Sequence, residues 1–263
     1  MYKRQDLKKA SLTLDISPII VAERIGRQKL EEGIVYEKSG IPMISISTLA
    51  MFAKGDKVFI YSKKGSYYVK INAQALRALR EKHGMSLGEL AYRIGVSRKA
   101  IYEYERGNMD VTLETAGRIY EVFGEEAIFK SLNIFDIRPK LREEEEVEAH
   151  TATESRLVQE LRNMGMITHH LEHTAADIVA SKESNRFVIV LAESCTENKD
   201  INLKVRESIK LSKASSSKLV VIAEDKSKYE EIIESHIGES DVLIERPNNI
   251  DKVISEIYTH TRR

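Results

Sequence analysis

LRALREKHGMSLGELAYRIGVSRKAIYEYERG, residues 76–107, contains short helical segments separated by glycine-bearing breaks. Gly84 ends one helix, and Ser86 is placed to cap the next because its hydroxyl can accept from the amides of the first turn. Gly95 supplies a tight turn, since glycine tolerates a positive φ that a β-carbon resists. Ser97 then caps a further helix. We therefore expect a helix, a turn and a second helix within this stretch.

The two short helices have distinct inner and outer faces. Helical spacing turns Leu90, Ala91 and Ile94 inward on the first helix, and Ile101 and Tyr104 inward on the second. The outward positions of the second helix are Arg98, Lys99, Tyr102, Glu103 and Arg106. A second helix with polar side chains at its N-terminal end is the helix-turn-helix geometry that fits the major groove of DNA.

The stretch resembles the helix-turn-helix domains of the Cro and lambda-repressor type. The matching elements are Leu90-Ala91, Gly95-Val96-Ser97, Ile101 and the closing Glu105-x-Gly107. The resemblance implies an all-α module of five helices over residues 73–134. A small helical bundle that only binds other proteins could imitate some of these elements, and it stays as an alternative.

The resemblance also implies roles for individual residues. Arg98, Lys99 and Glu103 stand where the family reads base edges, and Arg or Lys suits guanine while Glu can accept from the cytosine amino group. The positions that would contact DNA phosphates are Ser86, Ser97, Tyr102 and Arg106. Arg80 and Glu105 match an ion pair that is structural in the family. Leu87 departs from the pattern, because the family often has Gln there for phosphate and recognition-helix contacts.

Composition is that of a water-soluble globular protein. The chain has 263 residues, is 42% hydrophobic and has no apolar run near the ~20 residues that cross a bilayer, so we expect a cytoplasmic protein. Net charge is zero, but residues 1–71 carry 13 basic and 7 acidic side chains, residues 72–139 carry 10 of each, and the remainder is acidic. Cys195 is the single cysteine, which excludes an intramolecular disulfide. We expect no cofactor, because no phosphate-binding glycine loop or redox pair is present.

The segment before the helices alternates strands with helices. We expect strands over residues 18–22 and 43–46, a helix begun by Ser47 or Thr48, and a β-hairpin over 57–71. Lys63 and Lys64 occupy the hairpin turn. They could follow a DNA backbone as a wing, although lysines that only keep a turn soluble are more common.

The segment after Pro139 begins with the acidic run Arg142–Glu146, which we interpret as a solvated linker. An α/β pattern follows, with helices expected over 155–164, 202–214 and 229–236 and from Asn249. The expected strands are 167–171, 177–180, 187–192, 218–225 and 241–245.

The flanking segments resemble the restriction-endonuclease-like fold, where two acids on adjacent strands hold a divalent metal. Asp177 and Glu193 match the acids, but Cys195 stands where that family has the lysine that helps activate water, and Lys199 lies beyond the strand. We therefore expect a nuclease-like scaffold that is not an enzyme. A metal-dependent nuclease targeted by the helix-turn-helix remains the alternative.

Three histidines that lie shortly before Asp177 in the sequence also suggest a metal site. His169 and His170 lie in a predicted strand, where neighbouring side chains point to opposite faces and cannot converge. We interpret His169, His170 and His173 as surface residues and expect no metal site.

The two flanks contain a weak internal repeat. Residues 210–225 align with the N-terminal stretch so that Lys9 meets Lys210, Ser11 meets Ser212 and Ala22-Glu23 meets Ala223-Glu224. The N-terminal copy lacks the helix and strands that precede the repeat in the other copy. MYKRQ back-translates to a sequence that resembles a transposon end used in sequencing libraries. We thus expect a partial N-terminal domain, with residues 1–5 not native.

The whole chain resembles a group of archaeal helix-turn-helix transcriptional regulators. The expected parts are a partial α/β domain over 1–56, the hairpin, the helix-turn-helix domain over 72–139, a linker over 140–154 and an α/β domain over 155–263. The resemblance implies a regulator that binds double-stranded DNA, which we expect to act as a homodimer and to respond to an unknown effector. A non-DNA adaptor or antitoxin-like protein is a further alternative.

Overall fold

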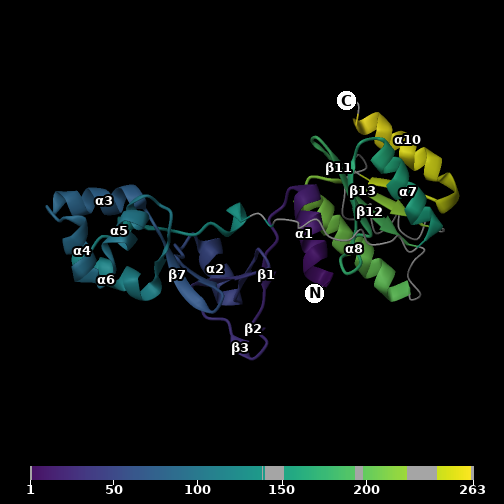
Figure 1. The fold of residues 1–263 in the computed structure, drawn as a ribbon. Coiled ribbons are helices and arrows are strands. Elements are labelled where there is room, and N and C mark those ends of the chain that lie inside the picture. Colours follow the sequence, from purple (N-terminus) through teal and green to yellow (C-terminus); the bar gives the residue numbers. More distant parts are fainter. Residues whose placement is uncertain (1, 138, 140–150, 193–197, 224–241, 262–263) are drawn as a thin grey trace. The chain divides into compact units, whose positions relative to one another are not determined.

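The computed structural model describes residues 2–137, 139, 151–192, 198–223 and 242–261. The chain divides into two compact units, residues 19–137 and residues 1–18 together with 138–263 (Figure 1). The expected linker run, the helix over 229–236, Glu193 and Cys195 lie outside the described residues. The structure contains both helices and sheets, which agrees with the expected combination of α and α/β domains. The exact domain boundaries stay a prediction.

A mixed seven-stranded sheet forms one side of the first unit. Its strands, in spatial order, are β1 (Ile20–Val21), β5 (Ile41–Ile44), β4 (Ile34–Lys38), β6 (Ile60–Lys63), β7 (Ser66–Ile71) and β8 (Val111–Thr112), with β9 (Phe129–Lys130) also paired to β7. The expected hairpin forms β6 and β7, and Lys64 and Gly65 make its turn with φ of 53° and 83°. Strand β4 was not predicted from the sequence. The helix expected to start at Ser47 or Thr48 is α2 (Ile46–Lys54), which begins slightly earlier because Ser45 Oγ accepts from Thr48 N.

Four helices follow the hairpin. They are α3 (Ala73–Lys82), α4 (Leu87–Ile94), α5 (Arg98–Glu105) and α6 (Leu113–Phe123). The expected fifth helix is wrong: residues 124–137 form the short 3₁₀ segments η1 (Glu126–Ile128) and η2 (Ile134–Asp136), with β9 after η1. The backbone there pairs with β7 instead, since Lys70 lies opposite Lys130 and Ile71 opposite Phe129.

The expected all-α module is also wrong, because β8 and β9 lie within residues 73–134 and the helices share their core with the sheet. Val69 and Ile71 of β7 pack with Leu76, Leu90 and Ile101 of the helices in one buried cluster. A hydrogen bond of 2.7 Å from the Tyr61 hydroxyl to Asp110 Oδ2 further joins β6 to the loop before β8. Burial and this carboxylate raise the pKa of Tyr61. The hairpin therefore supports the helical module.

The second unit is a five-stranded sheet with helices on both faces. Its strands, in spatial order, are β10 (Ile167–His170), β11 (Ile178–Lys182), β12 (Asn185–Leu191), β13 (Lys218–Ile222) and β14 (Val242–Glu245). One face packs against α7 (Ala152–Asn163) and α10 (Ile250–Thr261), and the other against α1 (Tyr2–Leu14) and α8 (Asn198–Ala214) (Figure 1). Because both faces are covered, the central strand β12 is a nearly continuous apolar run. None of the described helices is both long and apolar enough to span a membrane.

The internal repeat is visible in backbone geometry. Asp15 and Ser216, at equivalent positions, both have positive φ, 52° and 50°, at the ends of α1 and α8. The next residues make the same turn hydrogen bond, Ile16 N to Ser11 O and Ser217 N to Ser212 O. Parallel pairing follows in the same register, with Val21 opposite Ile44 in one copy and Ile222 opposite Glu245 in the other. However, α1 packs in the unit of the C-terminal copy.

Candidate nucleic-acid interface

The turn between α4 and α5 has the geometry expected from the sequence. Gly95 lies in the left-handed region with φ of 67°, and Val96 N donates to Ala91 O at 3.0 Å. Ser97 Oγ accepts from Ala100 N at 3.1 Å and so caps α5. Glycine is required at the turn because a β-carbon is unfavourable at this φ. These local bonds fix where α5 starts.

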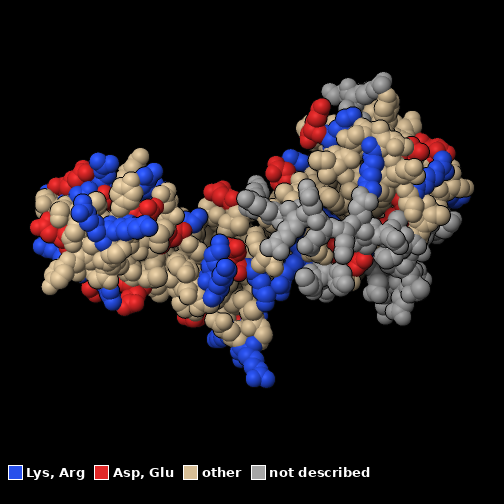
Figure 2. All heavy atoms as spheres, in the orientation of Figure 1, with Lys and Arg blue, Asp and Glu red and all other residues tan. Residues whose placement is uncertain are grey.

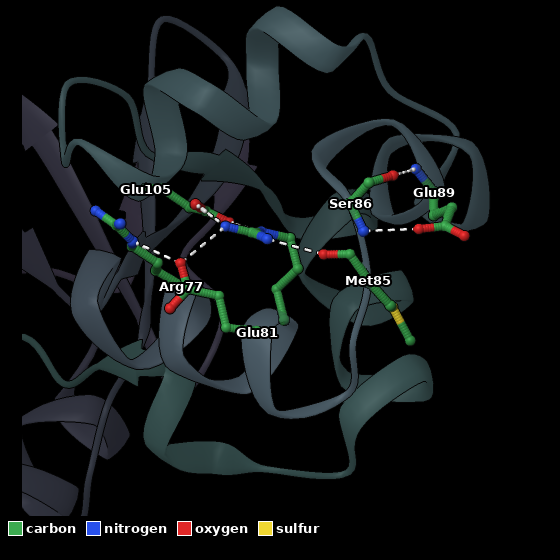
Figure 3. A network of polar contacts seen from close by, with 7 residues as sticks. Arg77, Glu81, Met85, Ser86, Glu89 and Glu105 are labelled. Atoms are coloured by element: carbon green, nitrogen blue, oxygen red, sulfur yellow. Dashed lines mark hydrogen bonds and ion pairs between the residues drawn. The ribbon is translucent and has the colours of Figure 1, made fainter.

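A capping box fixes the start of α4. Ser86 Oγ accepts from Glu89 N at 3.1 Å, while Glu89 Oε2 accepts from Ser86 N at 2.7 Å (Figure 3). These hydrogen bonds to its carboxylate lower the pKa of Glu89. Each serine hydroxyl at the helix starts still has its own proton to donate, which is what a phosphate contact from Ser86 or Ser97 would use.

The outer face of α5 carries several exposed cations. Arg98 and Lys99, at its first turn, are exposed and make no ion pair among the described residues. One turn later, Arg106 Nη1 donates to the Tyr102 hydroxyl at 2.6 Å, with the guanidinium 5.3 Å from the ring centre. Arg98, Lys99, Tyr102 and Arg106 are all exposed, as expected for residues that face a ligand.

Glu103 is held by a residue that the sequence analysis did not consider. Its Oε2 accepts from Asn108 Nδ2 at 2.7 Å, and its side chain is half-buried. A carboxylate has further acceptor positions, so Glu103 can still accept from a cytosine amino group. Asn108 therefore orients Glu103.

Arg80 and Glu105 form a bidentate ion pair between α3 and α5. Arg80 Nε lies 2.5 Å from Glu105 Oε1 and Nη2 lies 2.9 Å from Oε2, and the side chains are only 11% and 8% exposed. Arg80 also donates to Met85 O at 2.8 Å, in the loop that precedes α4. Because Glu105 accepts from it, the pKa of Arg80 is raised. One guanidinium thus joins α3, the α3–α4 loop and α5.

Leu87, the departure from the family pattern, has a packing role. It is half-buried and lies against the hydrophobic cluster that contains Leu90 and Ile94. Packing against the hydrophobic core therefore accounts for an apolar residue at this position. The structure supplies no polar group there for a phosphate.

Arg118 of α6 is a positioning residue that the sequence analysis missed. Its Nη1 donates to Ile94 O at 3.1 Å, and its Nη2 lies 2.6 Å from Glu114 Oε1. Ile94 is the last residue of α4, so Arg118 supplies a hydrogen bond to an unpaired helix-end carbonyl. The spacing of Glu114 and Arg118, one helical turn apart, was the available signal.

Replacing Gly95 with Ala is expected to destabilise the helix-turn-helix by about 1–2 kcal/mol, through the left-handed φ and through contact with Arg118. A β-carbon at Gly95 would lie 2.8 Å from Arg118 Nη1. Gly84 is the matched control, since its φ is 66° and its β-carbon would meet nothing within 4 Å. Urea unfolding of Gly95→Ala and Gly84→Ala measures the difference. Equal losses would show that Arg118 does not constrain the turn.

The cations of the hairpin turn differ in their contacts. Lys63 Nζ lies 3.7 Å from Glu37 Oε2. Lys64 makes no ion pair among the described residues. The hairpin is an interior pair of the seven-stranded sheet, because β4 and β8 pair with its outer edges. The backbone edges of the hairpin are therefore already paired, while its turn is exposed.

Asp177, the candidate metal-binding acid of the second unit, is engaged by protein groups. Its Oδ1 lies 2.5 Å from Lys204 Nζ of α8, and its Oδ2 accepts from Leu191 N at 2.7 Å. Lys204 was missed by sequence reasoning, although it lies one helical turn before the inward-facing Ser208. Both carboxylate oxygens therefore have protein partners inside the fold.

The interpretation of all three histidines as surface residues is wrong for His170. His170 is buried, and its Nε2 lies 2.7 Å from Oε1 of Glu154 on α7, which is also buried. The strand prediction holds, since His169 and His170 both lie in β10. Among the described residues, no three His, Cys, Asp or Glu side chains are grouped so that they could hold a metal ion.

Comparison with known proteins places these elements in families. Residues 76–128 match a helix-turn-helix family model, and residues 2–58 match a model of a PD-(D/E)XK superfamily domain. The chain is 33% identical to the "Putative HTH-type transcriptional regulatory protein" of Aeropyrum pernix, over 87% of this chain and 71% of the relative. The chain belongs to this archaeal family of HTH-type transcriptional regulatory proteins.

Other members of the family are similar to this chain at comparable identity. The protein of the same description in Sulfolobus acidocaldarius is 31% identical over 95% of this chain and 79% of its own length. The Archaeoglobus fulgidus member is 34% identical over 70% of this chain. The chain spans 59% of that member's length. The PD-(D/E)XK match lies in the N-terminal flank, where the sequence analysis expected only a partial domain, and the nuclease-like character of the C-terminal α/β domain stays a prediction.

Proposed function

We propose that the protein is a sequence-specific DNA-binding transcriptional regulator that reads the major groove with α5. The single observation that carries this proposal is the pair of exposed cations Arg98 and Lys99 at the first turn of a capped helix, where neither makes an ion pair with any residue that the structure describes. The family name, which describes transcriptional regulation, supports the same function. Cytoplasmic location is part of this proposal.

Base contacts are assigned to three residues of α5. Arg98 and Lys99 would donate to guanine O6 and N7, and Glu103, oriented by Asn108, would accept from a cytosine amino group. Phosphate contacts are assigned to Ser86, Ser97, Tyr102 and Arg106, which would fix the register of the helix on the duplex. Support comes from their exposed positions, with Ser86 at the start of α4 and the other three at the start and on the outer face of α5.

Salt dependence is the first test of DNA binding. Mixed-sequence duplex DNA should bind the protein more weakly as salt rises, because each phosphate contact releases counterions. Gel-shift titration between 50 and 200 mM salt measures this dependence. Binding that does not change with salt, or no binding at all, would favour the adaptor alternative.

Two copies of the chain are proposed to act together. One helix-turn-helix module reads only a few base pairs, and a two-fold pair doubles the contacts on a palindromic site. Dimerisation and response to an unknown effector are the roles proposed for the flanking domains. Sedimentation of the protein with and without a selected DNA site tests the pairing.

The protein is proposed not to cleave DNA, in contrast to the nuclease alternative. We expect supercoiled plasmid to remain intact with the protein and Mg²⁺ or Mn²⁺, because both oxygens of Asp177 are already bonded to Lys204 and Leu191. Agarose gels of plasmid topology measure cleavage. Nicking that disappears in Asp177→Ala would assign an active site to the second unit, and nicking that survives this change would place it elsewhere. Either result would contradict the proposal.

A further inference from the structure

A small two-stranded arm projects from the unit that contains the helix-turn-helix. We call residues 24–29 the β2–β3 arm; it pairs β2 (Arg24–Ile25) with β3 (Gln28–Lys29). Gly26, with φ of 60°, takes the first central position of its two-residue turn, as in type II′ hairpins. Leu30 N donates to Glu23 O at 2.9 Å and closes the base of the arm. The arm is thus a defined hairpin.

The arm is anchored by apolar side chains at its base. Leu30 is buried and Ile25 is half-buried, and both belong to a cluster with Tyr36 and Met43 of the sheet. The charged side chains Arg24, Arg27 and Lys29 are exposed. Packing therefore holds the arm in place and leaves its cations free to meet a ligand.

Two cations of the arm face each other across its strands. Arg24 lies directly opposite Lys29 in the hairpin register, and like charges in this position destabilise a hairpin. The arm contains no Asp or Glu, and its three cations make no ion pair among the described residues. Of the nearby acids, Glu31 instead accepts from the Tyr67 hydroxyl at 3.0 Å, which raises the pKa of Tyr67 to about 12. An anion placed between Arg24 and Lys29 would relieve the repulsion.

We propose that the β2–β3 arm binds the phosphate backbone of the DNA that α5 reads. This inference rests on the proposed function. Guanidinium and ammonium groups are the usual partners of phosphate oxygens, and three cations on one short hairpin can contact adjacent phosphates. The tip of the arm, at the position where Figure 1 labels β2 and β3, is covered by Lys and Arg atoms in Figure 2.

The test compares the salt dependence of DNA binding in two charge-matched variants. Arg24→Gln/Arg27→Gln/Lys29→Gln should reduce the slope of log affinity against log salt by about 2 to 3 on B-form DNA, because each lost contact removes about 0.9. Its preference for a selected site over random DNA should stay unchanged, since phosphates carry no sequence information. The control Arg206→Gln/Lys210→Gln/Arg246→Gln removes the same charge from exposed positions of the other unit. We expect it to leave the slope unchanged.

Thermal unfolding separates a ligand-binding role from a structural one. Removing the opposed charges should leave the stability of the free protein equal or raised, whereas structural cations would lower it when replaced. If the wild type binds DNA and loses that binding in Arg98→Ala/Lys99→Ala, but the arm variant keeps the wild-type slope, the arm inference alone is overturned. If the wild type binds no DNA, the proposed function fails and the arm inference fails with it.

Discussion

Replacing both Arg98 and Lys99 with Ala is expected to weaken binding to a selected DNA site by about 2–6 kcal/mol, roughly 30-fold or more, because each base contact of this type contributes about 1–3 kcal/mol. Both side chains are exposed and lie outside the hydrophobic core, so the fold should be retained. Fluorescence anisotropy with a labelled site, together with circular dichroism of the variant, measures the two effects.

Arg206→Ala/Lys210→Ala on α8 is the matched control for this prediction. It removes one Arg and one Lys from exposed positions in the other unit, so the change in net charge is identical. We expect a change in affinity below about threefold, since both residues belong to the unit that does not contain α5 and exposed charges outside the binding helix act only through screened fields. Equal losses in the two variants would mean that net charge, rather than α5, determines binding.

Breaking the Arg80–Glu105 ion pair by replacing Arg80 with Met is expected to destabilise the helix-turn-helix by about 3 kcal/mol, because Glu105 would keep a charge in a site that is only 8% exposed. Hydrogen exchange of peptides from residues 76–107, at increasing urea concentration, measures the loss within the intact chain. Early exchange confined to this segment is the expected pattern.

The double variant Arg80→Met/Glu105→Leu tests the cause of that loss. Apolar residues of similar size remove both charges, so we expect most of the stability to return. Arg80 also donates to Met85 O, and part of the loss should persist because that carbonyl loses its donor. A double variant as unstable as Arg80→Met would show that the stranded charge is not the cause.

The helix-turn-helix could be predicted from the sequence because the residues that signal its helix ends act on neighbouring residues. Ser86, Gly95 and Ser97 act on backbone groups within three or four residues, and the structure contains each of these caps and turns. Inward positions such as Leu90 and Ile101 followed from helical period alone. The starts and ends of these helices can therefore be predicted from neighbouring residues.

Errors arose where distant residues decide the conformation. Residues 124–134 were expected to continue the helical pattern, yet Phe129 and Lys130 within them pair with β7, a strand about sixty residues earlier. The pairing of His170 with Glu154 likewise joins β10 to α7 and has no sequence spacing that would reveal it. Asp177 was noticed as an acid, but its partner Lys204 lies on a helix 27 residues later. In all three cases, contacts between residues far apart in the sequence determine the structure.

The internal repeat shows how weak sequence similarity can correspond to strong structural similarity. Few identical residues relate the two copies, but their β-pairing follows one register throughout, as Ile20 opposite Met43 and Val221 opposite Ile244 show. Backbone hydrogen bonds tolerate many side chains, so register can persist while residues change. The position of α1 could not be predicted, because it packs with β10 and β11 of the other copy.

Selection of bound fragments from a random duplex pool, with the wild type and Arg98→Ala/Lys99→Ala in parallel, tests the central claim most directly. A regulator that reads bases with α5 should enrich one short motif, repeated as two half-sites if two copies bind. The variant should enrich no motif, or one altered at a position that Arg98 or Lys99 contacts. The same motif from both proteins, or no motif from the wild type, would contradict the assignment of α5 as the recognition helix.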